Sequence, residues 1–315
     1  MTNPIIIREA KHGLPYSKGL MASSIMATGL APAKAYAIAK TLEDKLAVEG
    51  QTTITVAALR KMTLATIENE VGREYALRYQ KWQALSKLEK PLIILIGGTT
   101  GVGKSTVATE VAHRLGITRI ISTDAIREVM RSIFTEELMP ALYNSSFDAW
   151  KKIHLPLPES ADPTIIGFRE QTSAVITGVN AIIHRAITER TNQILEGVHL
   201  VPGFRDYSSF ADKAFIIPLV ISVEEEELHR SHFYIRELET EGFRSFERYR
   251  SNFENIRKIG YYIGALAKKN SIPVIASHSL DTTVTVVLNE IVDRVILPRK
   301  GKGPSVIAKP AKVAP

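Results

Sequence analysis

One segment of the chain has the residue types and spacing needed to bind nucleotide phosphates. An apolar run over Leu92–Ile96 leads into Gly98-Thr99-Thr100-Gly101-Val102-Gly103-Lys104-Ser105-Thr106, which has the spacing G-x-x-x-x-G-K-S. In such a loop the backbone N–H groups surround the phosphates, and glycines let the backbone approach them closely. Lys104 is expected to reach the β- and γ-phosphates of ATP, and Ser105 to ligate Mg²⁺. A Gly-rich turn in an ordinary strand–helix–strand unit would leave Lys104 and Ser105 unexplained.

Two acids follow the ends of later predicted strands. Ligands of open α/β sheets bind at the carboxyl ends of the strands, so Asp124 is a candidate to orient or deprotonate an attacking hydroxyl. Asp124 could instead, or in addition, cap the next helix. Glu196 ends an apolar strand at a position where an acid commonly supports Mg²⁺, although aspartate is more usual there. The neighbouring His199 could contact substrate or cap a loop, and the sequence favours neither.

Basic side chains near these acids could bind anionic groups of a second substrate. Arg127 and Arg131 lie on the helix predicted after Asp124. Lys151 and Arg169 lie in a long insertion, which either forms the acceptor pocket or packs as helices on the sheet.

A further arginine-rich, helix-prone stretch follows the fourth predicted strand. It could form a lid that closes over ATP, with Arg230 and Arg236 stabilising charge on the transferred phosphoryl group. The alternative is a solvated helix face, because glutamates are interspersed among the arginines.

Composition limits the class of protein. The 315 residues are enough for two domains, and 45% of them are hydrophobic. There is no cysteine, which excludes disulfides, thiolate metal sites and a cysteine nucleophile. The N-terminus lacks a signal-peptide layout and no apolar run is long enough for a membrane helix, so we expect a cytoplasmic protein. Five of the basic residues behind the net charge of +7 follow Leu297, so the charge gives little reason to expect nucleic-acid binding.

The pattern along the chain changes at Glu89-Lys90-Pro91, where a helix must end. Residues 1–89 predict a mostly helical module with a short strand at Ile5–Ile7, a turn at Gly13–Pro15 and four helices. Residues 90–298 predict strands alternating with helices, hence a parallel sheet covered on both faces. Residues 299–315 predict a disordered basic tail. The expected strands of the sheet are Leu92–Ile96, Arg119–Ser122, Asn192–Glu196, Lys213–Val223 and Pro273–Ala276, and the last helix spans Leu280–Ile296.

Four stretches of residues together resemble the 2-phosphoglycerate kinases. They are Gly97–Thr106, Ile121–Arg131, Leu142–Ser146 and Ile194–His199, and the resemblance runs from about Pro91 to Leu297. It implies an α/β, P-loop kinase-type fold and ATP-dependent phosphorylation of the 3-hydroxyl of 2-phosphoglycerate, giving 2,3-bisphosphoglycerate and ADP. A basic pocket suits this small anionic acceptor, which carries a phosphate and a carboxylate.

The front module resembles the ATP-cone, a nucleotide-sensing module, through Ile5-Ile6-Ile7-Arg8 and Lys18. A regulatory nucleotide site using Arg8, Lys11 and Lys18 is one expectation, and a helical docking or oligomerisation domain is the other. For the whole chain, the alternatives are a kinase for another hydroxyl acceptor, including a nucleic-acid 5′ end, and an ATP-gated regulatory protein with little turnover.

Overall fold

The computed structural model describes residues 5–9, 12–48, 52–85, 88–152, 159–241 and 245–296. The chain divides into two compact units, with a boundary in the sequence between Leu88 and Glu89. The first unit also takes in His113–Gly116 and the end of the last helix from Leu288. Lys11 and the predicted tail over residues 299–315 lie outside the described residues.

The first unit combines helices with a small sheet. Its strands are β1 (Ile6–Glu9), β2 (His12–Pro15) and β3 (Thr53–Thr55), in the order β2-β1-β3. Its helices are α1 (Lys18–Met26), α2 (Pro32–Val48), α3 (Val56–Val71) and α4 (Arg73–Leu85). The hydroxyls of Ser17 and Thr55 cap α1 and α3 by accepting from N–H groups of the first turn. The segment expected as a turn is the strand β2, because Leu14 pairs with Ile7 in an antiparallel ladder.

The second unit is built on five parallel strands in the order β5-β6-β4-β7-β8. These strands are β4 (Leu92–Gly97), β5 (Ile120–Ser122), β6 (Gln193–Glu196), β7 (Phe215–Ser222) and β8 (Val274–Ala276). Its helices are α5 (Lys104–Leu115) up to Ala112, α6 (Thr123–Ile133), α7 (Pro163–Thr188), α8 (Glu226–Glu239), α9 (Phe246–Ser251), α10 (Phe253–Lys269) and the first half of α11 (Leu280–Ile296), up to Val287. Short 3₁₀ turns are η1 (Pro140–Tyr143), η2 (Ala149–Lys152) and η3 (Ser208–Phe210). The expected α/β sheet is confirmed.

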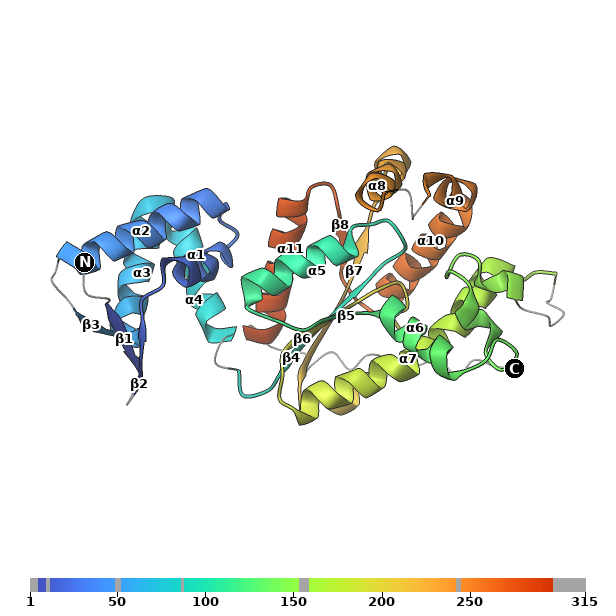
Figure 1. Cartoon of the computed structure of the whole chain (residues 1–315), viewed down its shortest axis with the longest axis horizontal. Helices are drawn as coiled ribbons and strands as arrows, with labels where there is room; N and C mark the ends of the chain where they lie inside the picture. Colours follow the sequence, from blue (N-terminus) through green and yellow to red (C-terminus); the bar gives the residue numbers. More distant parts are fainter. Residues whose placement is uncertain are drawn as a thin grey trace. The chain divides into compact units, whose positions relative to one another are not determined.

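Helices cover both faces of this sheet. Every residue of β4 is buried, as expected for a central parallel strand. Ile93 and Leu95 pack in one cluster with apolar side chains of α7, such as Val179 and Ile183. Figure 1 shows α5 on the opposite side of the strands from α7. None of the helices in the described parts of the chain is long and apolar enough to cross a membrane.

The long insertion after β5 is partly helical. It contains η1 and η2 and continues into α7, which begins with Pro163. Asp162 caps α7, since its carboxylate accepts from the N–H groups of Thr164 and Ile165. Leu142 of η1 packs in one buried cluster with side chains of α7 and β4, so this part of the insertion lies against the sheet.

Candidate active site

The glycine-rich loop connects β4 to α5 at the carboxyl edge of the sheet. Gly98, Gly101 and Gly103 all have positive φ, as a loop that turns its N–H groups inward requires. The side chain of Lys104, which begins α5, is buried, and its Nζ donates to the carbonyl of Thr99 at 2.7 Å. Burial lowers the pKa of Lys104, while the charges of Glu196 and Asp124 oppose that shift. The charges of both predicted acids therefore act on this lysine.

Ser105 and Glu196, the two expected metal residues, are brought together. Glu196 ends β6 beside β4, opposite Ile96 in the strand register. Burial raises the pKa of Glu196, and the charge of Lys104 and a hydrogen bond from Ser105 lower it. A hydroxyl and a carboxylate are oxygen ligands of the kind Mg²⁺ prefers. Within the described part of the chain, no group of three or more histidine or acidic side chains is arranged to hold a metal ion.

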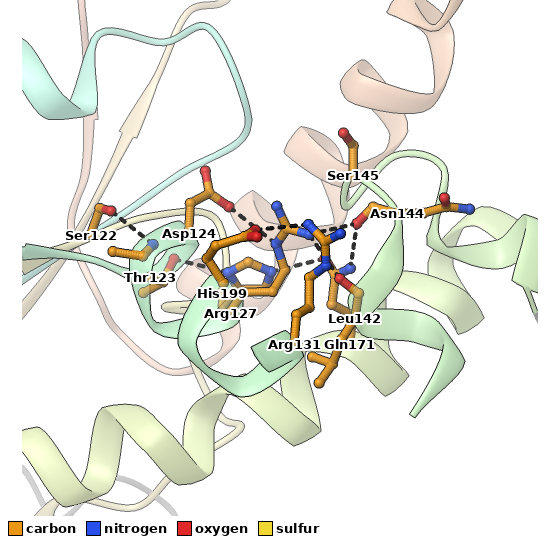
Figure 2. Close-up of polar contacts among 12 residues, drawn as sticks. Ser122, Thr123, Asp124, Arg127, Arg131, Leu142, Asn144, Ser145, Gln171 and His199 are labelled. Atoms are coloured by element: carbon orange, nitrogen blue, oxygen red, sulfur yellow. Dashed lines mark hydrogen bonds and ion pairs between the residues drawn. The ribbon is translucent and has the colours of Figure 1, made fainter. Parts of the chain in front are cut away.

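Asp124 lies in the first turn of α6 with an exposed carboxylate (Figure 2). The N-cap of this helix is Ser122, whose hydroxyl accepts from the N–H of Ala125 at 3.1 Å. Asp124 is therefore not needed as the cap. Its Oδ1 is 3.7 Å from Nε of Arg127, and 67% of its side chain is exposed. An accessible carboxylate whose charge acts on a buried lysine could act on a hydroxyl substrate.

A buried hydrogen-bond relay runs behind Asp124 (Figure 2). Nδ1 of His199 lies 2.9 Å from the hydroxyl of Thr123, and its Nε2 lies 2.9 Å from Oε1 of Gln171. Because Oε1 can only accept, Nε2 carries the proton and Nδ1 accepts from Thr123. All three side chains are fully buried, and burial lowers the pKa of His199 to about 4. His199, which the sequence left unassigned, is a neutral connecting residue.

Gly197 makes room for this relay. Its φ is +150°, and a Cβ at this position would overlap the hydroxyl of Thr123. The ends of β5 and β6 can therefore meet only if residue 197 has no side chain.

Two side chains hold the segment that follows α6. Nε2 of Gln171 donates to the carbonyls of Ala141 and Asn144, at 2.5 and 2.9 Å. Arg127 donates to the carbonyls of Leu142 and Asn144, at 2.8 and 3.1 Å (Figure 2). The relay therefore connects Thr123, next to Asp124, with the η1 segment. Nothing in the sequence pattern signalled Gln171.

The other residues predicted to bind the acceptor have partners of different kinds. Arg131 pairs with Glu128 at 2.8 Å and lies over the ring of Tyr143. Lys151 pairs with Asp148 at 2.6 Å. Arg169 is exposed on α7, and its charge acts on Tyr262 of α10.

The two arginines chosen for the lid stack on aromatic rings. The guanidinium of Arg230 lies 3.8 Å from the ring centre of Phe253, and that of Arg236 lies 5.8 Å from that of Tyr249. Arg248, one of the same arginine-rich stretch, donates to the hydroxyl of Ser145 at 2.9 Å. α9 therefore touches the segment after η1, through a residue that the sequence gave no reason to single out.

Of the predicted regulatory residues of the first unit, the structure describes Arg8 and Lys18. Lys18 pairs with Glu43 at 3.2 Å and lies over the ring of Tyr36, and Arg8 is exposed on β1. Lys11 lies outside the described residues. A nucleotide site in this unit stays a prediction.

Comparison with known proteins identifies the family. A curated 2-phosphoglycerate kinase from Pyrococcus furiosus is 40% identical over 308 residues, covering 97% of this chain and 99% of the relative. The chain belongs to the 2-phosphoglycerate kinase family. A second member of this family, from Methanopyrus kandleri, is 38% identical over 294 residues, covering 93% of the chain and 88% of the relative. The predicted family membership is thus confirmed, and both units of the chain fall within the shared length.

Other comparisons add little to this assignment. No protein-family model matches the chain. Among solved structures, a gluconokinase from Sinorhizobium meliloti 1021 aligns with a TM-score of 0.37 at 16% identity, over 64% of this chain and 91% of that one. A likeness this distant supports no conclusion.

Proposed function

We propose that this protein transfers the γ-phosphoryl group of ATP to the 3-hydroxyl of 2-phosphoglycerate, giving 2,3-bisphosphoglycerate and ADP. The observation that carries the proposal is the identity of 38–40% with 2-phosphoglycerate kinases over nearly the whole length of both chains. The site geometry supports the same class of reaction, because a phosphate loop and an accessible carboxylate lie at one edge of the sheet.

The nucleotide half of the site uses the loop between β4 and α5. The loop N–H groups and the dipole of α5 would hold the phosphates, and Lys104 would exchange its bond to the Thr99 carbonyl for phosphate oxygens. Ser105 and Glu196 would hold Mg²⁺, which neutralises phosphate charge when it is bound.

Asp124 is the proposed general base. As the 3-hydroxyl oxygen bonds to the γ-phosphorus, the bond from that phosphorus to the β–γ bridging oxygen breaks, and ADP leaves. The hydroxyl proton passes to the carboxylate of Asp124, whose exposure leaves it open to an acceptor from solvent.

To bind the anionic groups of the acceptor, a basic side chain must exchange its present acidic partner for the substrate. The pair between Arg131 and Glu128 is exposed, and such pairs stabilise a protein by only ~0–1 kcal/mol. Exchanging Glu128 for a substrate phosphate is therefore inexpensive. Lys151, Arg169 and the arginines Arg230 and Arg236 are the further proposed cations, and Arg127 keeps the η1 segment in place beside them.

Replacing Asp124 distinguishes between two hypotheses for this protein, an enzyme and an ATP-gated regulator with little turnover. Asp124→Asn should lower kcat by about 10²–10⁴-fold while the Kd for ADP stays within about twofold, because the carboxylate takes the proton and does not hold the nucleotide. Asp212→Asn is the matched control, since Asp212 is an exposed acid just before β7, at the opposite edge of the sheet. Equal turnover by the two variants, measured as ADP release and compared with calorimetric ADP binding, would refute the role of Asp124.

A further inference from the structure

Two histidines of α8 contact the phosphate loop. Nε2 of His229 lies 2.8 Å from the carbonyl oxygen of Thr100, and Nδ1 of His232 lies 2.9 Å from that of Gly101. A carbonyl can only accept, so each of these ring nitrogens carries a proton and donates. The two histidines are three residues apart on one helix and therefore share a face of α8.

α8 is fitted closely against the loop at this point. His229 is fully buried, and its ring stacks on that of Phe233 with centres 5.1 Å apart. Gly101 has a φ of +84°, and a Cβ there would overlap the ring of Phe233. Glycine at position 101 thus meets two requirements, the turn of the loop and the approach of α8.

Each of three successive loop carbonyls has a side-chain donor. Lys104 donates to the carbonyl of Thr99, and His229 and His232 donate to the next two. Lys104 is expected to leave the Thr99 carbonyl when phosphates bind. His229 and His232 come from α8 and can keep their hydrogen bonds to the carbonyls of Thr100 and Gly101.

Fixing a carbonyl also fixes the N–H of the same peptide. In a planar trans peptide, the C=O of one residue and the N–H of the next point in opposite directions. Holding the carbonyls of Thr100 and Gly101 against α8 therefore turns the N–H groups of Gly101 and Val102 away from α8. In a loop of this kind the N–H groups are the ones that bind phosphate.

We propose that His229 and His232 are positioning residues that preset the N–H groups of Gly101 and Val102 for the polyphosphate of a nucleoside di- or triphosphate. The inference rests on nucleotide binding within the proposed function, and it is independent of the acceptor. A loop that is already oriented loses less conformational freedom on binding, which strengthens the affinity.

The test is a pair of substitutions at His232, which is only half-buried and leaves the packing of His229 intact. His232→Asn keeps an amide N–H near the position of Nδ1, whereas His232→Leu removes the donor. The Kd values for ADP and for AMP, which lacks the β-phosphate, are measured by calorimetry on the full chain. We expect His232→Leu to weaken ADP about tenfold and AMP less, and His232→Asn to restore ADP binding to within about threefold of the parent.

Three results would overturn the proposal: unchanged ADP binding in His232→Leu, equal weakening of ADP and AMP, or no rescue by asparagine. The same comparison at the Thr100 carbonyl uses His229→Gln, which keeps a donor near Nε2, and His229→Leu. If the parent chain binds ADP but does not phosphorylate 2-phosphoglycerate, the proposed acceptor is wrong and the role of the histidines is unaffected. If the parent does not bind ADP, both proposals fail.

Discussion

The buried imidazole of His199 makes the stability of the protein depend on pH in a way that can be calculated. Its Nε2–H is donated to Gln171 and its Nδ1 accepts from Thr123, so in the folded protein a second ring proton would break the hydrogen bond from Thr123. Burial lowers the pKa of His199 to about 4 from an ordinary value of 6.5. Between these values the unfolded chain binds a proton that the folded protein excludes, and stability falls as the pH falls.

The expected loss follows from the two pKa values. Lowering the pH from 7.5 to 4.5 favours the unfolded chain by about 2.5 kcal/mol through His199 alone, since one pKa unit corresponds to about 1.4 kcal/mol. Above pH 6.5 both states are neutral at this ring, and the effect vanishes. Below pH 4 the folded protein also takes up the proton, and no further loss arises from this residue.

The variant His199→Gln isolates this contribution, because glutamine does not titrate in this range. At pH 7.5 the variant should be less stable by about 1–3 kcal/mol, since the hydroxyl of Thr123 or the amide of Gln171 loses a buried partner. At pH 4.5 the difference should be smaller by about 2.5 kcal/mol, because only the parent chain has lost stability through this ring. Urea denaturation at both pH values gives the two differences. A difference that is the same at both would show that His199 titrates normally, and the relay would be wrong.

Three other residues and the nucleotide stoichiometry give further predictions. Lys104→Met should lower kcat about 10²–10³-fold with little loss of stability, because burial already disfavours the charged amine; a large fall in the denaturation midpoint would contradict this. Gly197→Ala should lower the free energy of unfolding, measured by urea denaturation, by roughly 2–4 kcal/mol, because the backbone at residue 197 has a positive φ and the new Cβ would overlap Thr123. An unchanged free energy of unfolding would count against the close approach of residue 197 to Thr123. Gln171→Leu should raise the KM for the acceptor more than that for ATP, because the η1 segment loses two hydrogen bonds; equal changes in steady-state kinetics would refute it. If the first unit binds a regulatory nucleotide, calorimetry should find two equivalents of ATP per chain, and a single equivalent would exclude it.

The sheet and the phosphate loop could be predicted because their signals are local. The apolar run of β4 must be buried on both faces, and its switch to glycines and Lys104 fixes where strand gives way to helix. The same holds for α11, whose predicted bounds Leu280–Ile296 agree with the structure. β2 was mistaken for a turn because Gly13-Leu14-Pro15 has turn-forming residues, and only pairing with β1 makes it a strand.

The connections around the site could not be predicted, because they join residues distant in the sequence. Gln171 contacts His199 and the η1 segment from the interior of a long helix, where a glutamine normally suggests a solvated position. His229 and His232 stand among charged residues typical of an exposed helix, yet both reach loop carbonyls about 130 positions earlier. Such contacts depend on how α7 and α8 pack on the sheet, which no local pattern encodes.

Phosphoryl transfer to a panel of acceptors tests the proposed function most directly. ADP release with Mg²⁺ and ATP is measured for 2-phosphoglycerate, 3-phosphoglycerate, shikimate and a 5′-hydroxyl oligonucleotide, and the product is identified by mass. We expect turnover with 2-phosphoglycerate well above that with the other three, giving 2,3-bisphosphoglycerate, and its loss in Asp124→Asn. Turnover confined to another acceptor, or none above the rate of ATP hydrolysis in water, would contradict it.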